Sequence, residues 1–336
     1  MQISKADSVR IGLLSVVLIG LALGPYWADR GTMRLLIEAF YFLALAQLWN
    51  LLAGYSGLIS VGQQAFVGLG GYLLFTLTMF AGLPVLLALP LAGILTGILA
   101  WPTALVAFRL SGPYFAIGTW VIAEVYRLSF AQISSLGGGS GISLPTDIVR
   151  SMADGRSARE SVTYWIALAI MLAVILGIWA LMRSRVGLGL GAIRDNEEAA
   201  TSIGVRTTRL KFAVFVGVAA MTGMIGALIF LQKLRITPEA AFSVNDWSVL
   251  VIFIVVIGGI GSLEGPILGC ILFFVLREFL ADLGSWYMII LGVISVGIML
   301  LEPRGLWGML NRKRSLTLFP IARRSPKLIR LSQDTP

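Results

Sequence analysis

The sequence has no histidine and a single cysteine, Cys270, among its 336 residues. One cysteine excludes a disulfide within the chain and any cysteine-based metal cluster. The absence of histidine excludes the usual zinc sites, Ser-His-Asp triads and histidine proton relays. No lysine follows a glycine anywhere in the chain, so a Gly-x-x-x-x-Gly-Lys phosphate-binding loop is missing too. The chain therefore lacks the residues of several common catalytic sites, and we predict that it does not bind and hydrolyse ATP itself.

Charged residues are also scarce. They make up 13% of the chain while hydrophobic residues make up 57%, against about 25% charged residues in ordinary soluble domains. A soluble fold has too little polar surface here to cover its apolar residues, so we expect a lipid bilayer as solvent. The net charge of +9 comes from basic residues in loops and near the C-terminus. That distribution follows the positive-inside rule, and we expect no nucleic-acid partner.

Apolar segments recur along the chain, and a helix needs about 20 apolar residues to cross the hydrocarbon core. The candidates lie at 11–27, 35–53, 61–80, 84–108, 113–133, 163–182, 212–232, 248–262, 266–281 and 285–301. The first has no small-residue cleavage pattern after it, so we expect a retained helix. The third, eighth and ninth are rich in glycine. The predicted fold class is all-α, a polytopic transmembrane helical bundle of about ten spans, with some spans broken or re-entrant.

Basic residues predict the orientation of these spans. Arginine and lysine are concentrated in the loop 183–211 and in the residues after 302, which places both in the cytoplasm. Counting spans backwards puts the N-terminus in the cytoplasm as well and the segment 134–162 outside. We therefore expect a transmembrane domain over 1–310 and a basic cytoplasmic tail over 311–336.

The cytoplasmic loop contains a motif typical of a short, exposed helix. Asp195 or Asn196 is placed to cap it, two glutamates occupy its first turn, and Gly204 is a natural stop in a left-handed conformation. Ala199, Ala200 and Ile203 give it a small, mildly apolar face that suits docking into a groove of another protein. An ordinary solvated loop helix fits the same spacing. The residues of interest are Arg194, Glu197, Glu198, Ala199, Ala200 and Gly204.

The string Glu198-Ala199-Ala200-x-x-x-Gly204 resembles the Glu-Ala-Ala-x-x-x-Gly loop of bacterial ABC import permeases. With its flanks, from Ser184-Arg185-Val186-Gly187 onwards, it resembles the branched-chain amino acid permease family, in its LivM-type branch. Three further blocks, 57–72, 112–119 and 258–269, resemble that family in the same order. The chain departs from the wider pattern in two places: Gln63-Gln64 stand where His-Ala is frequent, and no Ile-x-Leu-Pro element follows Gly204. The resemblance covers about residues 35–305.

The resemblance implies a permease subunit in a bacterial inner membrane. The partners implied are a second related permease, two ATP-binding-cassette ATPases and an extracytoplasmic substrate-binding protein. ATP and Mg would be bound by the ATPases, leaving this chain without a cofactor, metal or catalytic residue. The short helix would be the coupling helix, which contacts an ATPase. Substrates of the family include leucine, isoleucine and valine, other amino acids, and small amides such as urea, and the sequence does not choose among them.

The Gly/Ser-rich blocks suggest a substrate path, because glycines let helices break and leave backbone groups facing a polar passage. The predicted path residues are Ser60, Gly62, Gln63, Phe66, Tyr114, Phe115, Gly118 and Thr119. Close helix packing explains the same glycines without a path. Ionisable residues within the spans are Glu38, Glu124, Arg127, Glu264, Arg277 and Glu278. For Glu124 and Arg127, three residues apart, we favour a structural ion pair over substrate contact.

Two other classes of protein stay open at this stage. A secondary transporter or channel would need no ATPase, and the acidic helix ending at Gly204 argues against it. An integral-membrane enzyme would be expected to place His, Asp or Glu side chains together at the membrane surface. The sequence has no histidine and no dense acidic cluster, so we consider it the weaker of the two.

Overall fold

The computed structural model describes residues 5–150, 152, 155–280, 284, 286–302 and 304–313. Ten helices overlap the ten predicted segments. They are α1 (Lys5–Ala22), α3 (Arg30–Asn50), α4 (Gln63–Met79), α5 (Val85–Ala107), α6 (Pro113–Ala131), α8 (Arg156–Met182), α11 (Thr207–Lys233), α13 (Leu250–Gly258), α14 (Glu264–Leu280) and α15 (Trp286–Leu301). Nine of them are long, and α13, with nine residues, continues the π-helical turn Asn245–Val249. The predicted all-α class is thereby confirmed for the described residues.

Short elements connect these helices. The short α-helices are α2 (Gly24–Trp27), α7 (Thr146–Arg150), α9 (Arg185–Asp195), α10 (Glu197–Ser202), α12 (Pro238–Ala241) and α16 (Gly305–Lys313). The π-helical turns are η1 (Leu51–Tyr55) and η4 (Asn245–Val249), and the 3-10 turns are η2 (Ser134–Leu136) and η3 (Gly138–Ser140). The sequence did not predict strands, yet β1 (Ile142–Ser143) and β2 (Arg235–Ile236) form an antiparallel pair with Ile142 opposite Ile236.

Within the described residues, five helical stretches are long and apolar enough to cross a bilayer. They are Arg30–Tyr55, Val85–Ala107, Arg156–Met182, Thr207–Lys233 and Pro238–Gly258, and a sixth results if the bent pair Ile289–Leu301 and Gly305–Arg312 is one span. The predicted count of about ten is not confirmed by this criterion. One reason is length, because α4 and α14 have 17 residues and α15 has 16. At 1.5 Å per residue such helices are about 25 Å long.

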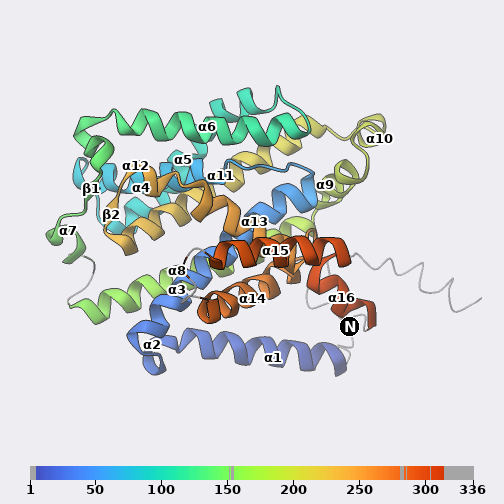
Figure 1. The fold of residues 1–336 in the computed structure, drawn as a ribbon, viewed down its shortest axis with the longest axis horizontal. Helices are drawn as coiled ribbons and strands as arrows, with labels where there is room; N and C mark the ends of the chain where they lie inside the picture. The colour runs from blue at the N-terminus through green and yellow to red at the C-terminus, as the bar shows by residue number, and fades with distance from the viewer. Residues whose placement is uncertain are drawn as a thin grey trace, which may run out of the picture.

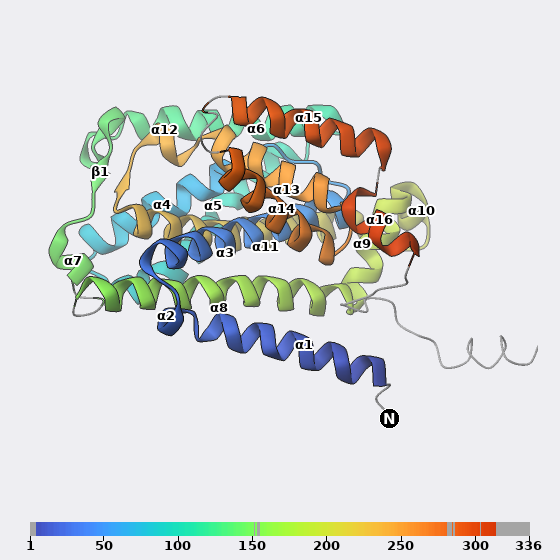
Figure 2. The same ribbon diagram turned by 60° about the horizontal axis from the view of Figure 1, so that its bottom comes forward.

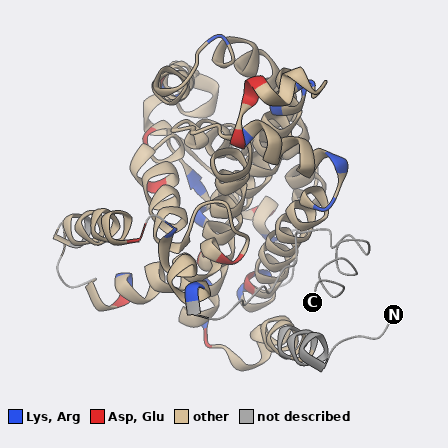
Figure 3. Ribbon diagram, turned by 90° about the vertical axis from the view of Figure 1, so that its right-hand side faces the viewer, with Lys and Arg blue, Asp and Glu red and all other residues tan. Residues whose placement is uncertain are grey.

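The long helices run along a common direction, which is the long axis of the molecule (Figures 1 and 2). One end, here called the α10 end, holds α9, α10, α16 and the start of α1. The other end, the β1 end, holds β1 and α7. Figure 3 faces the α10 end and shows a mostly uncharged ribbon with short charged segments. The predicted loops 183–211 and 134–162 therefore lie at opposite ends of the bundle.

Helix α11 is the centre of the packing. It lies against α4 and α5, and α3 packs on α8. Glycines allow the closest approaches: a Cβ added to Gly70 would lie 1.8 Å from the carbonyl oxygen of Gly223, and one added to Gly226 would lie 2.1 Å from that of Val67. The packing interpretation of the glycine-rich block is therefore confirmed at Gly70.

Helix α3 ends in a π-helical turn beside the loop between α13 and α14. The amide of Asn50 donates to the carbonyl of Ser262 at 2.8 Å, and its oxygen accepts from the N–H of Gly261, also at 2.8 Å. Gln47 donates to the carbonyl of Leu263 at 2.7 Å. Two buried amide side chains of α3 thus hold the glycine-rich turn that the sequence marked at 258–269.

Candidate coupling site and substrate path

The predicted coupling helix is α10, and its local geometry follows the sequence closely. The side chain of Asn196 accepts from the N–H of Ala199 at 2.9 Å, so Asn196 rather than Asp195 is the cap. Gly204 has φ +89°, and its N–H donates to the carbonyl of Thr201 at 2.9 Å. The predicted left-handed stop at Gly204 is confirmed. Glu197 pairs with Lys211 of α11, with 2.6 Å between Oε2 and Nζ.

The two alanines of α10 differ in exposure. Ala200 is 2% exposed and packs within this chain, where α10 meets α9 and α11. Ala199 is exposed, and Ile203, one turn later, is 77% exposed. The expectation that Ala199 and Ala200 both face a partner is therefore wrong for Ala200, because its methyl group packs within this chain. The other residues of α10 are exposed, and the exposed apolar ones are Ala199 and, at the C-cap, Ile203.

Arg194 connects this region to the break in α3. Its guanidinium pairs with Asp195 at 3.1 Å and donates to the carbonyl of Gly54 at 3.4 Å. Gly54 belongs to η1, whose start is held to the Gly261–Ser262 turn by Asn50. The structure therefore links the end of α9 to the α3 break and to the α13–α14 turn. The sequence marked these three segments separately and contained no signal that they meet.

Most predicted path residues are buried and used in packing. Backbone contacts hold the two blocks together: a Cβ on Gly62 would lie 2.3 Å from the carbonyl oxygen of Thr119, and the Thr119 hydroxyl accepts from the N–H of Val61 at 3.1 Å. The carbonyl of Ser60 accepts from the Trp49 indole at 2.7 Å. The structure brings the blocks 57–66 and 112–119 together, as a shared path requires.

The other predicted path residues differ in their surroundings. Phe66 and Phe115 are buried and pack against Phe215, with ring centroids 5.6 and 6.3 Å away. The amide nitrogen of Gln63 donates to the carbonyl of Leu45 at 3.1 Å, while its buried Oε1 has no partner among the described residues. Tyr114 is 71% exposed. A Cβ on Gly118 would meet only the end of the Leu110 side chain within 3 Å.

A cavity of about 610 Å³ lies where the two blocks reach the α10 end. Its walls come from Gly57–Ile59, from the turn between α5 and α6, and from the starts of α10 and α11. Of the predicted path residues, Phe115 lines it; of the predicted coupling residues, Glu197 does. The two sites predicted separately therefore border one cavity.

Ionisable residues of the long helices form pairs. Arg127 binds Glu124 through Nε at 2.9 Å and also reaches Glu239 at 3.1 Å. Arg277 binds Glu38 at 2.7 Å, which ties α14 to α3. The expected pairing of Glu124 with Arg127 is confirmed. Glu264 is buried at the start of α14.

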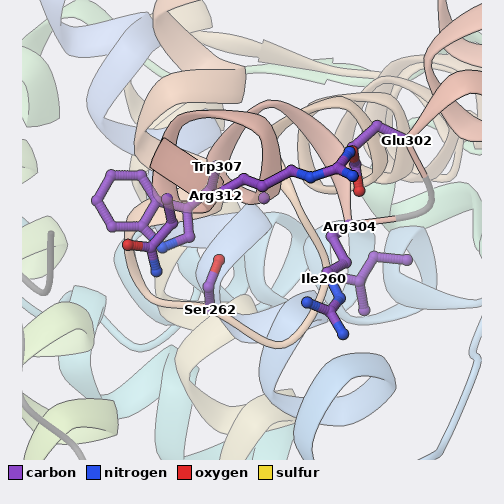
Figure 4. A pocket seen from close by; sticks show the side chains of 8 residues that line it. Ile260, Ser262, Glu302, Arg304, Trp307 and Arg312 are labelled. Atoms are coloured by element: carbon purple, nitrogen blue, oxygen red, sulfur yellow. The ribbon is translucent and has the colours of Figure 1, made fainter. Parts of the chain in front are cut away.

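A second cavity at the α10 end, of about 680 Å³, lies between the α13–α14 turn and α16 (Figure 4). Ile260 and Ser262 come from the turn, and Trp307 and Arg312 from α16. Arg312 extends toward Glu302, with 3.9 Å between Nη1 and Oε2. The sequence does not predict this cavity, because the expected tail 311–336 begins inside α16. Residues 311–313 belong to α16, and 314–336 lie outside the described residues.

Comparison with known proteins agrees with the resemblance in the motifs. A family model described as "Branched-chain amino acid transport system / permease component" matches residues 31–300. The chain is 30% identical over 326 residues to the high-affinity branched-chain amino acid transport system permease protein LivM of Escherichia coli, covering 90% of this chain and 76% of that protein. It is 29% identical over 322 residues to LivM of Salmonella typhimurium, covering 89% and 75%.

A more distant relative carries a different name. The autoinducer 2 import system permease protein LsrC of an Enterobacter strain is 24% identical over 333 residues, covering 92% of this chain and 90% of that protein. No solved structure matches the chain. The family match spans most of the sequence, and its bounds enclose the path blocks, the coupling helix and the α13–α14 turn. The chain therefore belongs to the family of permease components of branched-chain amino acid transport systems.

Proposed function

We propose that this chain is the membrane permease subunit of an ABC importer for branched-chain or other apolar amino acids. The observation that carries the proposal is α10, a capped helix whose exposed apolar residues are Ala199 and, at its C-cap, Ile203. Ile203 is 77% exposed and lines a surface hollow with Leu188 and Val205, and an exposed apolar patch of this kind is typical of a docking surface. Leu188 on the neighbouring α9 is 60% exposed and extends the apolar surface.

The proposed partners follow from this assignment. Two ATPases bind ATP and Mg, and one of them receives α10; a second related permease and an extracytoplasmic binding protein complete the importer. The ten helices that overlap the predicted segments are the proposed spans, in a bacterial inner membrane. The α10 end faces the cytoplasm together with both ends of the chain, and the β1 end faces the binding protein. The LivM relatives favour amino acids as substrates over the autoinducer named for the more distant LsrC.

The exposed face of α6 is the proposed contact with the second permease. Glu124 is 45% exposed and Arg127 is 28% exposed, and Glu124 lies about 16 Å along α6 from Pro113 at 1.5 Å per residue. A charged side chain in the middle of a span is unfavourable by about 2.5–3.5 kcal/mol when it faces lipid. Protein or water must therefore cover this face. Tyr114, on the same helix, belongs to the predicted path, so the passage is proposed to run along α6, past the blocks 57–66 and 112–119.

The test uses the exposed C-cap residue Ile203 in the purified complex, reconstituted in lipid vesicles. Burying an isoleucine side chain contributes about 1.5–3 kcal/mol. Ile203→Ala is therefore expected to weaken the binding of the ATPase about ten- to hundredfold, and Ile203→Asp to abolish substrate-stimulated ATP hydrolysis. Gly204→Val should act in the same direction by distorting the exit of α10.

The matched control is Phe80→Ala. Phe80 is an apolar residue that is 58% exposed at the end of α4, away from the α10 end. It should leave ATPase binding unchanged. Normal ATPase binding and normal stimulated hydrolysis in Ile203→Asp would show that α10 is not the coupling element, and the proposal would lose its main support.

A further inference from the structure

The cavity of about 610 Å³ beside α10 has an apolar wall, a wall of exposed backbone and a pair of charged side chains. Leu58, Phe108, Leu110 and Phe115 make an apolar wall, and Gly57 and Gly112 expose backbone. No atom of the described residues lies within 4 Å of a Cβ placed on either glycine, so this backbone borders open space in the described part of the chain. The size falls within the range of about 300–1,000 Å³ that is usual for small-molecule sites.

Among the described residues, one cation and one anion line this cavity, and they come from different helices. Lys211 of α11 and Glu197 of α10 form an ion pair of 2.6 Å. The side chain of Lys211 is 14% exposed and that of Glu197 is 49% exposed, so a ligand reaches the pair from the Glu197 side. The N-terminal end of the 19-residue α6 also borders the cavity through Pro113, Phe115 and Ala116. The N–H of Phe115 is already paired with the carbonyl of Gly112, so this helix end contributes through the positive end of its dipole.

This arrangement matches a small ligand that carries both charges and an apolar group. We propose that the cavity binds a zwitterionic α-amino acid with an apolar side chain, with its carboxylate at Lys211 and the start of α6 and its ammonium at Glu197. The side chain lies against Phe115 and Leu58. The inference rests on the proposed amino-acid transport and places a substrate site at the cytoplasmic end of the passage.

Binding at this site changes the contact that holds α10. The ligand inserts between Glu197 and Lys211, so two ion pairs replace one and the two side chains move apart. Glu197 is the first residue of α10 and Lys211 lies in α11, so their separation shifts the coupling helix relative to the span that follows it. Occupancy of the cavity is thereby transmitted to the surface that contacts the ATPase.

The experiment measures equilibrium binding of leucine to the purified complex of permeases and ATPases, without the binding protein and without ATP. Leucine amide, which lacks the carboxylate, and 4-methylpentanoate, which lacks the ammonium, serve as matched ligands. The intact complex should bind leucine at least tenfold more tightly than either. Lys211→Gln should abolish the preference over leucine amide, and Glu197→Gln the preference over 4-methylpentanoate. An ion pair that only holds α10 in place would not alter either ligand preference.

The control variant is Arg34→Gln, which breaks the 2.9 Å pair between Arg34 of α3 and Glu160 of α8, away from the cavity. It should keep both ligand preferences. Unchanged preferences in Lys211→Gln and Glu197→Gln would overturn the site while leaving the permease assignment intact. Failure of the intact complex to bind any amino acid would overturn the proposed substrate class together with the site.

Discussion

A methyl group added at Gly70 tests the central helix contact, where α4 crosses α11. The ideal Cβ position lies 1.8 Å from the carbonyl oxygen of Gly223 and 2.6 Å from its Cα. Carbon atoms in favourable contact are about 3.5–4.0 Å apart, so Gly70→Ala forces the two helices apart by about 1 Å or more. The obstacle is backbone, and no side-chain rotation relieves it.

Two effects of opposite sign act on the Gly70→Ala variant. Alanine favours a helix over glycine by about 1 kcal/mol. Overpacking a well-packed contact destabilises by about 1–3 kcal/mol, and by more when backbone must move. The clash at Gly70 is with backbone at 1.8 Å, so we expect the packing effect to win, with a net loss of up to about 2 kcal/mol.

Gly217→Ala is the matched control. Gly217 lies on α11, like Gly223, but no atom is within 4 Å of its ideal Cβ. Only the higher helix propensity of alanine then acts, and the free energy of unfolding should be unchanged or raised by up to about 1 kcal/mol. Thermal unfolding of the purified permease in detergent, followed by circular dichroism, compares the two. The reasoning is refuted if Gly70→Ala unfolds at the same temperature as Gly217→Ala.

Two further predictions concern the ends of α3. Asn50→Ala leaves the N–H of Gly261 and the carbonyl of Ser262, both half-buried, without their 2.8 Å partners. The loss should destabilise by about 0.5–1.5 kcal/mol for each hydrogen bond. Hydrogen–deuterium exchange at Gly261 should accelerate, and an unchanged rate would contradict the role given to Asn50. At the other end, hydrogen bonds from the Thr32 hydroxyl and then from the Gly31 N–H lower the pKa of Asp29. The ionised Asp29 carboxylate therefore stabilises the fold fully above its pKa in the unfolded chain, and this stabilisation disappears as the pH falls through its pKa in the folded chain. The difference in Tm between the native protein and Asp29→Ala should persist at neutral pH and vanish in strong acid. A difference in Tm that survives in strong acid would refute this.

The positions of the long helices were predictable from the sequence. The segment predicted at 113–133 is α6 at Pro113–Ala131, and the one at 84–108 is α5 at Val85–Ala107. Hydrocarbon thickness sets the length of an apolar run whatever the helix packs against. The start and end of α10 were predictable for a similar reason, since a cap at Asn196 and a stop at Gly204 involve residues within one turn.

Contacts between distant segments were decided only by the tertiary structure. Asn50 and Gly261 are 211 residues apart, and the pattern of apolar residues does not say which helix faces which. The burial of Ala200 and the exposure of Ala199 depend on where α9 and α11 lie around α10. The pairing of Lys211 with Glu197 and the cavity they share with Phe115 likewise need three separate chain segments to converge. Local sequence determined each helix, because its hydrogen bonds join residues four apart. Tertiary packing determined the site, because its residues come from helices whose relative rotation is set by side-chain fit along the whole bundle.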